Sequence, residues 1–139
     1  APFRYYPSAS ELAANSDYLV VAVPGGDDTK NMINAQVLKA LGPKGIVINI
    51  ARGSVVDQTA LIQALKDKSI AGAGLDVFWD EPNIDPQFFK LQNVVLTPHI
   101  ASATVPTRTA MVRSSPVAIR VVWRMPILPR PRRASASCP

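Results

Sequence analysis

Four side chains of this sequence form a set that could reduce a 2-oxo acid: Arg52, Asp76, Glu81 and His99. The imidazole of His99, the only histidine among the 139 residues, can exchange a proton near neutral pH. A carboxylate beside it favours the protonated ring and fixes its orientation. A guanidinium can hold a substrate carboxylate through two parallel hydrogen bonds. With a cofactor that supplies hydride, these groups would hold the acid and protonate the developing alkoxide.

Each of these residues also has a plain structural interpretation when it is taken alone. A lone histidine is more often structural than catalytic, Arg52 could be a solvated loop residue, and Glu81 precedes a proline and could belong to a turn. Asp76 is harder to explain in this way, because it stands among Gly, Leu, Val and Phe, where an unpaired carboxylate is costly to bury. The case for chemistry depends on whether the fold brings the four together.

The elements that must position these residues are predicted by short apolar runs that alternate with helical segments. Continuous apolar runs, the first of them typical of a strand buried on both faces, predict strands at 17–24, 45–50, 70–78 and 93–98. Capping residues and amphipathic spacing predict helices at 8–16, 34–41 and 58–68, with Ser8, Asn34 and Asp57 at their N-termini. This alternation predicts an α/β fold, a parallel sheet with helices on both faces.

The chemically interesting residues follow the predicted strands. Ligands of such sheets bind beyond the carboxyl ends of the strands. The loops at these ends contain, in chain order, Pro24-Gly25-Gly26, Ala51-Arg52-Gly53, Asp76 with Glu81, and His99. We therefore expect four loops that are distant in sequence to converge on one edge of the sheet.

Residues 17–111 resemble the cofactor-binding domain of the D-isomer-specific 2-hydroxyacid dehydrogenases, and most closely the glyoxylate/hydroxypyruvate reductase branch. The matching segments are LGPKGIVINIARGSVVDQTALIQAL, AGAGLDVFWDEP and NVVLTPHIASAT, in the family's order and spacing. The resemblance implies a Rossmann-type doubly wound sheet and NAD or NADP as the cofactor. It also implies a small 2-oxo acid substrate, glyoxylate or hydroxypyruvate, and a homodimeric parent enzyme.

The same resemblance implies a role for each site residue. Arg52 would orient the substrate, and His99, paired with Glu81, would be the general acid and base. Formate-oxidising relatives usually carry Gln in place of this Glu, which favours a hydroxy-acid substrate. Asp76 would bind the nicotinamide carboxamide. The cofactor-binding set that the resemblance implies is Pro24, Ala51, Arg52, Asp76, His99, Ala101 and Ser102, and no metal ligands are expected.

The sequence departs from the family in ways that bear on activity. It contains no G-x-G-x-x-G phosphate loop, and Gly25-Gly26 has neither the spacing nor the following helix to replace it. NAD and NADP therefore cannot be distinguished. The small substrate-binding domain is also missing, and the likeness ends after Met111. We expect residues 1–112 to be a partial dinucleotide-binding domain, either of a working reductase or of a truncated, catalytically incompetent remnant.

The basic excess of the chain lies in residues 113–139. Of a net charge of +5, this segment contributes six Arg, with five Pro and no acid, while residues 1–112 hold nine Lys or Arg against ten Asp or Glu. Such a tail is typical of disordered or out-of-frame sequence, with a nucleic-acid-binding arm as the less favoured alternative. The lone Cys138 favours a reducing compartment, the cytoplasm, and no apolar run reaches the roughly 20 residues of a membrane span.

Overall fold

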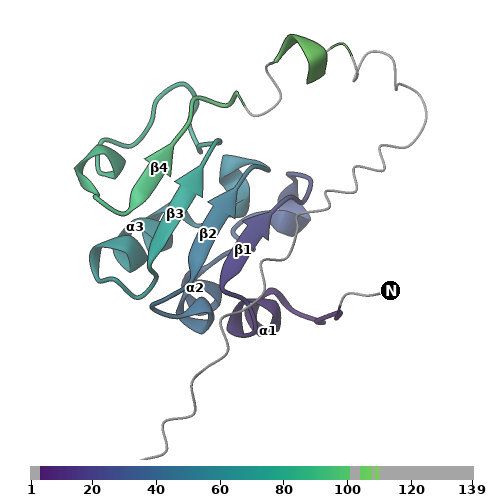
Figure 1. Ribbon diagram of the computed structural model, residues 1–139, viewed down its shortest axis with the longest axis vertical. Coiled ribbons are helices and arrows are strands. Elements are labelled where there is room, and N and C mark those ends of the chain that lie inside the picture. The colour runs from purple at the N-terminus through teal and green to yellow at the C-terminus, as the bar shows by residue number, and fades with distance from the viewer. Residues whose placement is uncertain (1–3, 101–103, 108, 110–139) are drawn as a thin grey trace, which may run out of the picture.

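The strands of the computed structural model, which describes residues 4–100, 104–107 and 109, form one parallel sheet (Figure 1). Each strand is shorter than the apolar run that predicted it: β1 Tyr18–Val21, β2 Ile46–Asn49, β3 Gly72–Leu75 and β4 Val94–Leu96. The strands are neighbours in chain order, and every pair is parallel. The predicted α/β fold with a parallel sheet is confirmed.

Three α-helices occupy the predicted segments, and their caps are the predicted residues. They are α1 Ala9–Ala14, α2 Ala35–Leu41 and α3 Gln58–Lys66. Ser8 Oγ accepts the Glu11 N–H, Asn34 Oδ1 accepts the Val37 N–H and Asp57 Oδ1 accepts the Ala60 N–H, at 3.2, 3.1 and 3.0 Å. Three 3-10 turns lie in the connections: η1 Asp27–Thr29, η2 Gly53–Val55 and η3 Phe88–Lys90.

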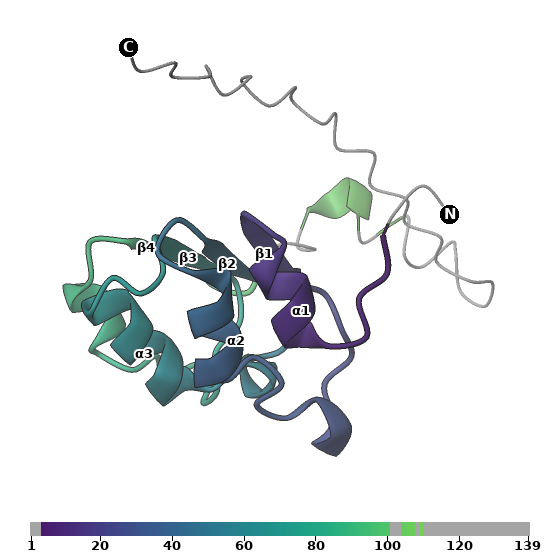
Figure 2. The same ribbon diagram turned by 90° about the horizontal axis from the view of Figure 1, so that it is seen from below.

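The three α-helices form one layer on the same side of the sheet (Figure 2). Successive parallel strands joined by crossovers of the same hand place all their helices on one face. The strand side chains on that face are buried and pack against the helices, among them Leu19, Val47 and Leu75 with Leu38 and Leu61. The described residues thus supply one helical layer and the core beneath it.

The opposite face of the sheet presents apolar side chains to solvent. Tyr18, Val20 and Val95 are 63%, 52% and 68% exposed. The prediction that the first strand is buried on both faces is therefore wrong within the described residues, because its burial alternates along the strand. A run of apolar residues does not itself show whether a second layer covers it.

Several sequence-based expectations fall outside the described residues. Ala101 and Ser102, expected near the nicotinamide, are among them, as is the tail at 113–139. The expected domain boundary after residue 112 is therefore still a prediction. In the part of the chain that the structure describes, every helix is too short or too polar to traverse a lipid bilayer.

Candidate active site

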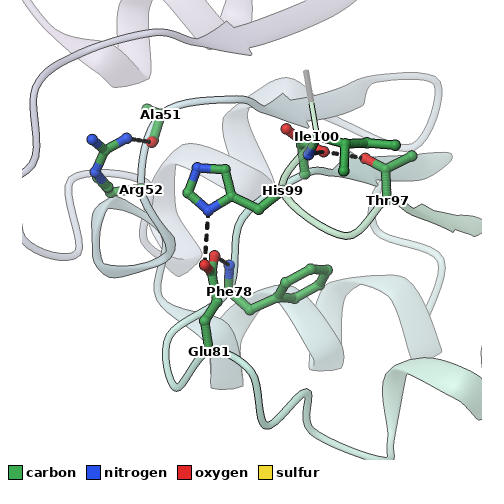
Figure 3. A network of polar contacts seen from close by, with 8 residues as sticks. Ala51, Arg52, Phe78, Glu81, Thr97, His99 and Ile100 are labelled. Carbon is green, nitrogen blue, oxygen red and sulfur yellow. Dashed lines mark hydrogen bonds and ion pairs between the residues drawn. The ribbon is translucent and has the colours of Figure 1, made fainter. Parts of the chain in front are cut away.

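The predicted acid–base pair is in contact at the carboxyl edge of the sheet (Figure 3). His99 Nδ1 lies 2.7 Å from Glu81 Oε2, and the two side chains are 45% and 35% exposed. A carboxylate only accepts hydrogen bonds, so this contact places the proton of the neutral ring on Nδ1. Nε2, which is directed away from Glu81 in Figure 3, is then the nitrogen that can exchange a proton with a ligand.

Glu81 is held by a second hydrogen bond. Its Oε1 accepts the backbone N–H of Phe78 at 2.9 Å. The hydrogen bond from His99 is the main cause that lowers the pKa of Glu81, followed by the Phe78 N–H, with a smaller contribution from the charge of Arg52. The carboxyl group is therefore ionised at neutral pH. An ionised Glu81 accepts the hydrogen bond from Nδ1 and so fixes the orientation of the imidazole.

The turn that carries His99 is tied to the end of β3. Asp76 follows β3 directly and is 6% exposed. Its Oδ1 accepts the Thr97 hydroxyl at 2.6 Å and the Ile100 N–H at 3.0 Å. Between these two tethers His99 has a φ of 53°, in the left-handed region that non-glycine residues seldom occupy.

The loop that carries Arg52 is fixed by Asn49, a residue that the sequence analysis did not single out. Asn49 is 2% exposed; its Oδ1 accepts the Ala51 N–H and its Nδ2 donates to the Arg52 carbonyl, both at 3.0 Å. Arg52 Nη1 donates to the Ala51 carbonyl at 2.6 Å. The one signal of Asn49 in the sequence is that a polar residue interrupts the apolar run GIVINI.

Close contact between two backbones brings the Arg52 loop to the Glu81 loop. A Cβ on Gly53 would lie 2.0 Å from the Phe78 carbonyl carbon and 2.1 Å from its oxygen. Only glycine can be accommodated at such a distance. Gly53 therefore lets the two loops pack against each other. The contact joins residues 25 positions apart, and the local sequence around Gly53 does not predict it.

Two hollows lie at this edge. An open one of about 690 Å³ is lined by the segments after β1 and β2, including the predicted cofactor-lining residues Pro24, Ala51 and Arg52. A smaller one of about 150 Å³ is lined by Glu81 and His99 together with Phe78, Pro82, Ile84 and Pro98. Asp76 lines neither hollow. The described residues contain no cluster of three or more His, Cys, Asp or Glu side chains that could hold a metal ion.

Comparisons with known proteins identify the family of the chain. Residues 2–101 match the family described as D-isomer specific 2-hydroxyacid dehydrogenase, NAD binding domain. The chain is 50% identical over 109 residues to glyoxylate/hydroxypyruvate reductase A of Arabidopsis thaliana, a match that covers 78% of the chain. It is 55% identical over 108 residues to 2-ketogluconate reductase of Gluconobacter oxydans. The chain spans 35% of the length of each.

Among solved structures, the chain is similar to the NADPH-dependent glyoxylate/hydroxypyruvate reductase of Sinorhizobium meliloti in complex with NADP and malonate. The TM-score is 0.78 at 50% identity, over 81% of this chain and 35% of that one. The holo form of Rhodotorula graminis D-mandelate dehydrogenase gives a TM-score of 0.72 at 37% identity, over 76% of this chain and 31% of that one.

Proposed function

The chain belongs to the D-isomer specific 2-hydroxyacid dehydrogenase family, and from that premise we propose that it serves hydride transfer between NAD(P)H and a small 2-oxo acid. The 2.7 Å contact of Glu81 with His99 is the observation that carries the proposal. The names of the relatives point to glyoxylate or hydroxypyruvate as the substrate. NAD and NADP both fit the proposal, since the family binds NAD and a solved relative holds NADP.

The side chains of the site divide the reaction between them. Arg52 grips the substrate carboxylate after exchanging its hydrogen bond to the Ala51 carbonyl for one to the ligand. The 2-oxo carbon would gain the hydride that the cofactor supplies, and the electron pair of its C=O π bond would move to the oxygen, which takes the proton of His99 Nε2. Glu81 stabilises the imidazolium before that transfer. The reverse sequence oxidises the 2-hydroxy acid.

The edge of the sheet offers room for the cofactor that this chemistry needs. The open hollow beside Pro24 and Ala51 is lined also by Gly25 and Gly26, where a ligand can approach the backbone. We propose that Pro24, Ala51 and Arg52 line the bound cofactor, and that Asp76, His99, Ala101 and Ser102 lie at its nicotinamide end. When bound, this cofactor supplies the hydride.

A second proposal concerns the 139 residues as an isolated polypeptide. Their sequence contains no G-x-G-x-x-G, so the polypeptide offers no phosphate loop to the pyrophosphate of a dinucleotide. We expect no measurable oxidation of NADH or NADPH by this polypeptide with glyoxylate or hydroxypyruvate. Steady turnover that disappears in His99→Ala would contradict this second proposal and support the first.

A graft into a full-length relative tests the catalytic roles, because the relative supplies the parts that the 139 residues do not contain. Residues 18–100 would replace the matching segment of the Sinorhizobium meliloti reductase, and reduction of both oxo acids would be followed by the absorbance of the reduced cofactor. We expect the graft to turn over and His99→Ala to lower kcat about 100- to 10,000-fold, the usual contribution of a general acid. Arg52→Ala should mainly raise KM.

The control for this experiment is Thr59→Ala, because Thr59 is an exposed residue of α3, in the helical layer. It should leave both kinetic constants unchanged. A folded graft that binds cofactor but does not turn over would contradict the proposed roles of Arg52, Glu81 and His99. So would a graft whose turnover survives His99→Ala.

The family resemblance also supports a homodimeric parent enzyme, and we propose a cytoplasmic location for it. The lone Cys138 agrees with a reducing compartment. Sedimentation analysis of the graft would test the first expectation, and fractionation of cells that express the native gene would test the second.

A further inference from the structure

The conformation of His99 needs an explanation that its contact with Glu81 does not supply. A non-glycine residue with a φ of 53° is strained, and such strain persists only where neighbouring contacts fix the backbone on both sides. The His99 N–H donates to the Thr97 carbonyl at 3.0 Å, which closes a tight turn. The turn still has to be fixed to the rest of the fold at both of its ends.

Asp76 provides that fixation. The Thr97 hydroxyl, two residues before His99, and the Ile100 N–H, one residue after it, both donate to Asp76 Oδ1. A carboxyl oxygen can accept two hydrogen bonds at once, so one atom of Asp76 holds the turn on both sides of His99. The Thr97 hydroxyl also lies 3.4 Å from the Leu75 carbonyl, but its contact with Asp76 is shorter at 2.6 Å.

Asp76 can serve as an anchor because its own backbone is hydrogen-bonded to the sheet. Its N–H donates to the Asn49 carbonyl at 3.0 Å, so the end of β3 is joined to the end of β2. Asn49 in turn fixes the loop that carries Arg52. The loops that carry Arg52 and His99 are therefore both anchored at the carboxyl ends of β2 and β3.

We propose that Asp76 is a positioning residue that, through the Thr97 hydroxyl and the Ile100 N–H, holds His99 in the left-handed conformation that sets Nδ1 against Glu81. This inference rests on the proposed function insofar as it makes Glu81 and His99 the proton donor. It assigns Asp76 an action through the polypeptide, separate from the contact with a nicotinamide carboxamide that the family resemblance implies.

Substitutions at Thr97 give the sharpest test, because they remove one donor and leave Asp76 in place. Thr97→Val replaces the hydroxyl by a methyl group of similar size, and Thr97→Ser keeps the hydroxyl and loses a methyl group. If the hydroxyl positions His99, Val should disturb the site and Ser should not. If Thr97 only fills space, Thr97→Ser should disturb the site more than Thr97→Val does.

The measurement is NMR spectroscopy of the full 139-residue chain without cofactor or substrate. His99 is the only histidine, so its ring nitrogen signals are identified at once. In Thr97→Val we expect loss of the Nδ1 signature of the contact with Glu81. The pKa of Glu81 should rise toward its ordinary value, though only in part, because the Phe78 N–H still lowers it. Thr97→Ser should keep both properties.

Unchanged ring signals and an unchanged pKa of Glu81 in a folded Thr97→Val chain would overturn the proposal. Should Thr97→Val fail to fold, Asp76→Asn replaces it, since Asn has the same shape and retains a neutral acceptor oxygen. The Ile100 amide proton should then move upfield and exchange faster with solvent. An Ile100 amide that is unaffected by Asp76→Asn would overturn the proposal equally.

The two proposals fail in different experiments. The NMR test contains no cofactor and no substrate, and it depends only on how the turn is held. A graft without turnover would remove the proposed reaction but leave the role of Asp76 in the turn. If the graft turned over but Thr97→Val left the His99 ring signals and the pKa of Glu81 unchanged, the positioning role of Asp76 would be refuted and the proposed reaction would stand.

Discussion

The N-caps of the helical layer and the polar contacts at the carboxyl edge of the sheet differ in the sequence range that they span. In the layer, each N-cap side chain bonds to a backbone N–H two or three residues away, and apolar packing joins the helices to the sheet; α3 also makes two side-chain hydrogen bonds to the segment before β4, at Asp85 and Gln87. At the edge, Asp76 bonds to residues 21 and 24 positions away, and Glu81 meets His99 across 18 positions. These contacts therefore form only when β3 and β4 are in place, and the Asp76 N–H joins them to the end of β2.

The two regions also differ in what they bury. Asn49 and Asp76 are the buried polar or charged residues of the described chain, and both stand at the carboxyl edge, at the ends of β2 and β3. Burying such groups costs free energy unless they are hydrogen-bonded. The layer gains stability from apolar burial, whereas the edge uses buried polar groups to fix loop geometry. Substitutions in the two regions should therefore have different consequences.

Gly53→Ala should have the largest effect. The added methyl group would meet the backbone of Phe78, which cannot rotate away, so the strand ends would have to separate. We expect the free energy of unfolding to fall by at least about 3 kcal/mol, the upper range for overpacking. Denaturant unfolding of the 139-residue chain measures it. The matched control is Gly26→Ala, where nothing lies within 4 Å of the new atom; equal losses in both variants would refute the close contact.

Asn49→Ala should come next. It removes both hydrogen bonds of the side chain and leaves the N–H of the buried Ala51 without that acceptor. We expect a loss of about 2 kcal/mol, the usual cost of an unsatisfied buried polar group. The backbone NMR signals of Ala51 and Arg52 should shift with it.

Asn93→Ala is the counterpart of Asn49→Ala at the opposite edge. Asn93 precedes β4, is half-buried and donates to the Leu65 carbonyl at 3.1 Å. The variant loses this bond and a longer one to the Ala71 carbonyl at 3.4 Å, and should be less stable by about 1 kcal/mol, the usual net value of a hydrogen bond. The signals of Arg52 should not change. If they did, the two ends of the sheet would not be independent.

Asn34→Ala tests the helical layer itself. Losing the N-cap of α2 should cost about 1 kcal/mol, a typical value for a cap, and Asn34→Asp should recover most of it. The ring signals of His99 should be the same in all three chains. A change at His99 in Asn34→Ala would show that the helical layer and the carboxyl edge are coupled.

The same difference in range explains which features could be read from the sequence. The caps, the strands and the order of elements follow local patterns, and all were predicted. Arg52, Glu81 and His99 were placed on one edge by a rule about strand ends, which needs no knowledge of contacts. Two contacts could be found only in the structure: the backbone contact of Gly53 with Phe78 and the hydrogen bond of Thr97 to Asp76. In neither case does the local sequence indicate the partner.

Burial of the sheet shows the limit of the apolar pattern itself. The run around Val20 has the composition of a strand covered on both faces, yet Val20 is half exposed. Residue type fixes which side chains gain by burial, but the cover must come from elsewhere in the fold. Composition could therefore predict the strand and could not predict its second layer.

The smallest effect on stability is expected from protonation of Glu81. Its pKa in the folded chain lies below the ordinary value of 4.5, so ionised Glu81 stabilises the fold above that value. The contribution is lost as the pH falls through the lowered pKa. Plotted against pH, the unfolding free energy of the chain should thus exceed that of Glu81→Gln by a margin that shrinks in acid. Water competes at this exposed site, so the margin is small.

Asp67 provides the control for this prediction in the helical layer. Hydrogen bonds from Ser69 lower its pKa, and the sign of its contribution is the same, but its partner is two residues away. Asp67→Asn should lose a similar acid-dependent margin and leave the His99 ring signals unchanged. Glu81→Gln should alter those signals, because the ionised acceptor of Nδ1 is gone. If both variants altered the His99 ring signals, or neither did, Glu81 and Asp67 would not differ in their influence on the site, and the proposed distinction between the edge and the layer would be wrong.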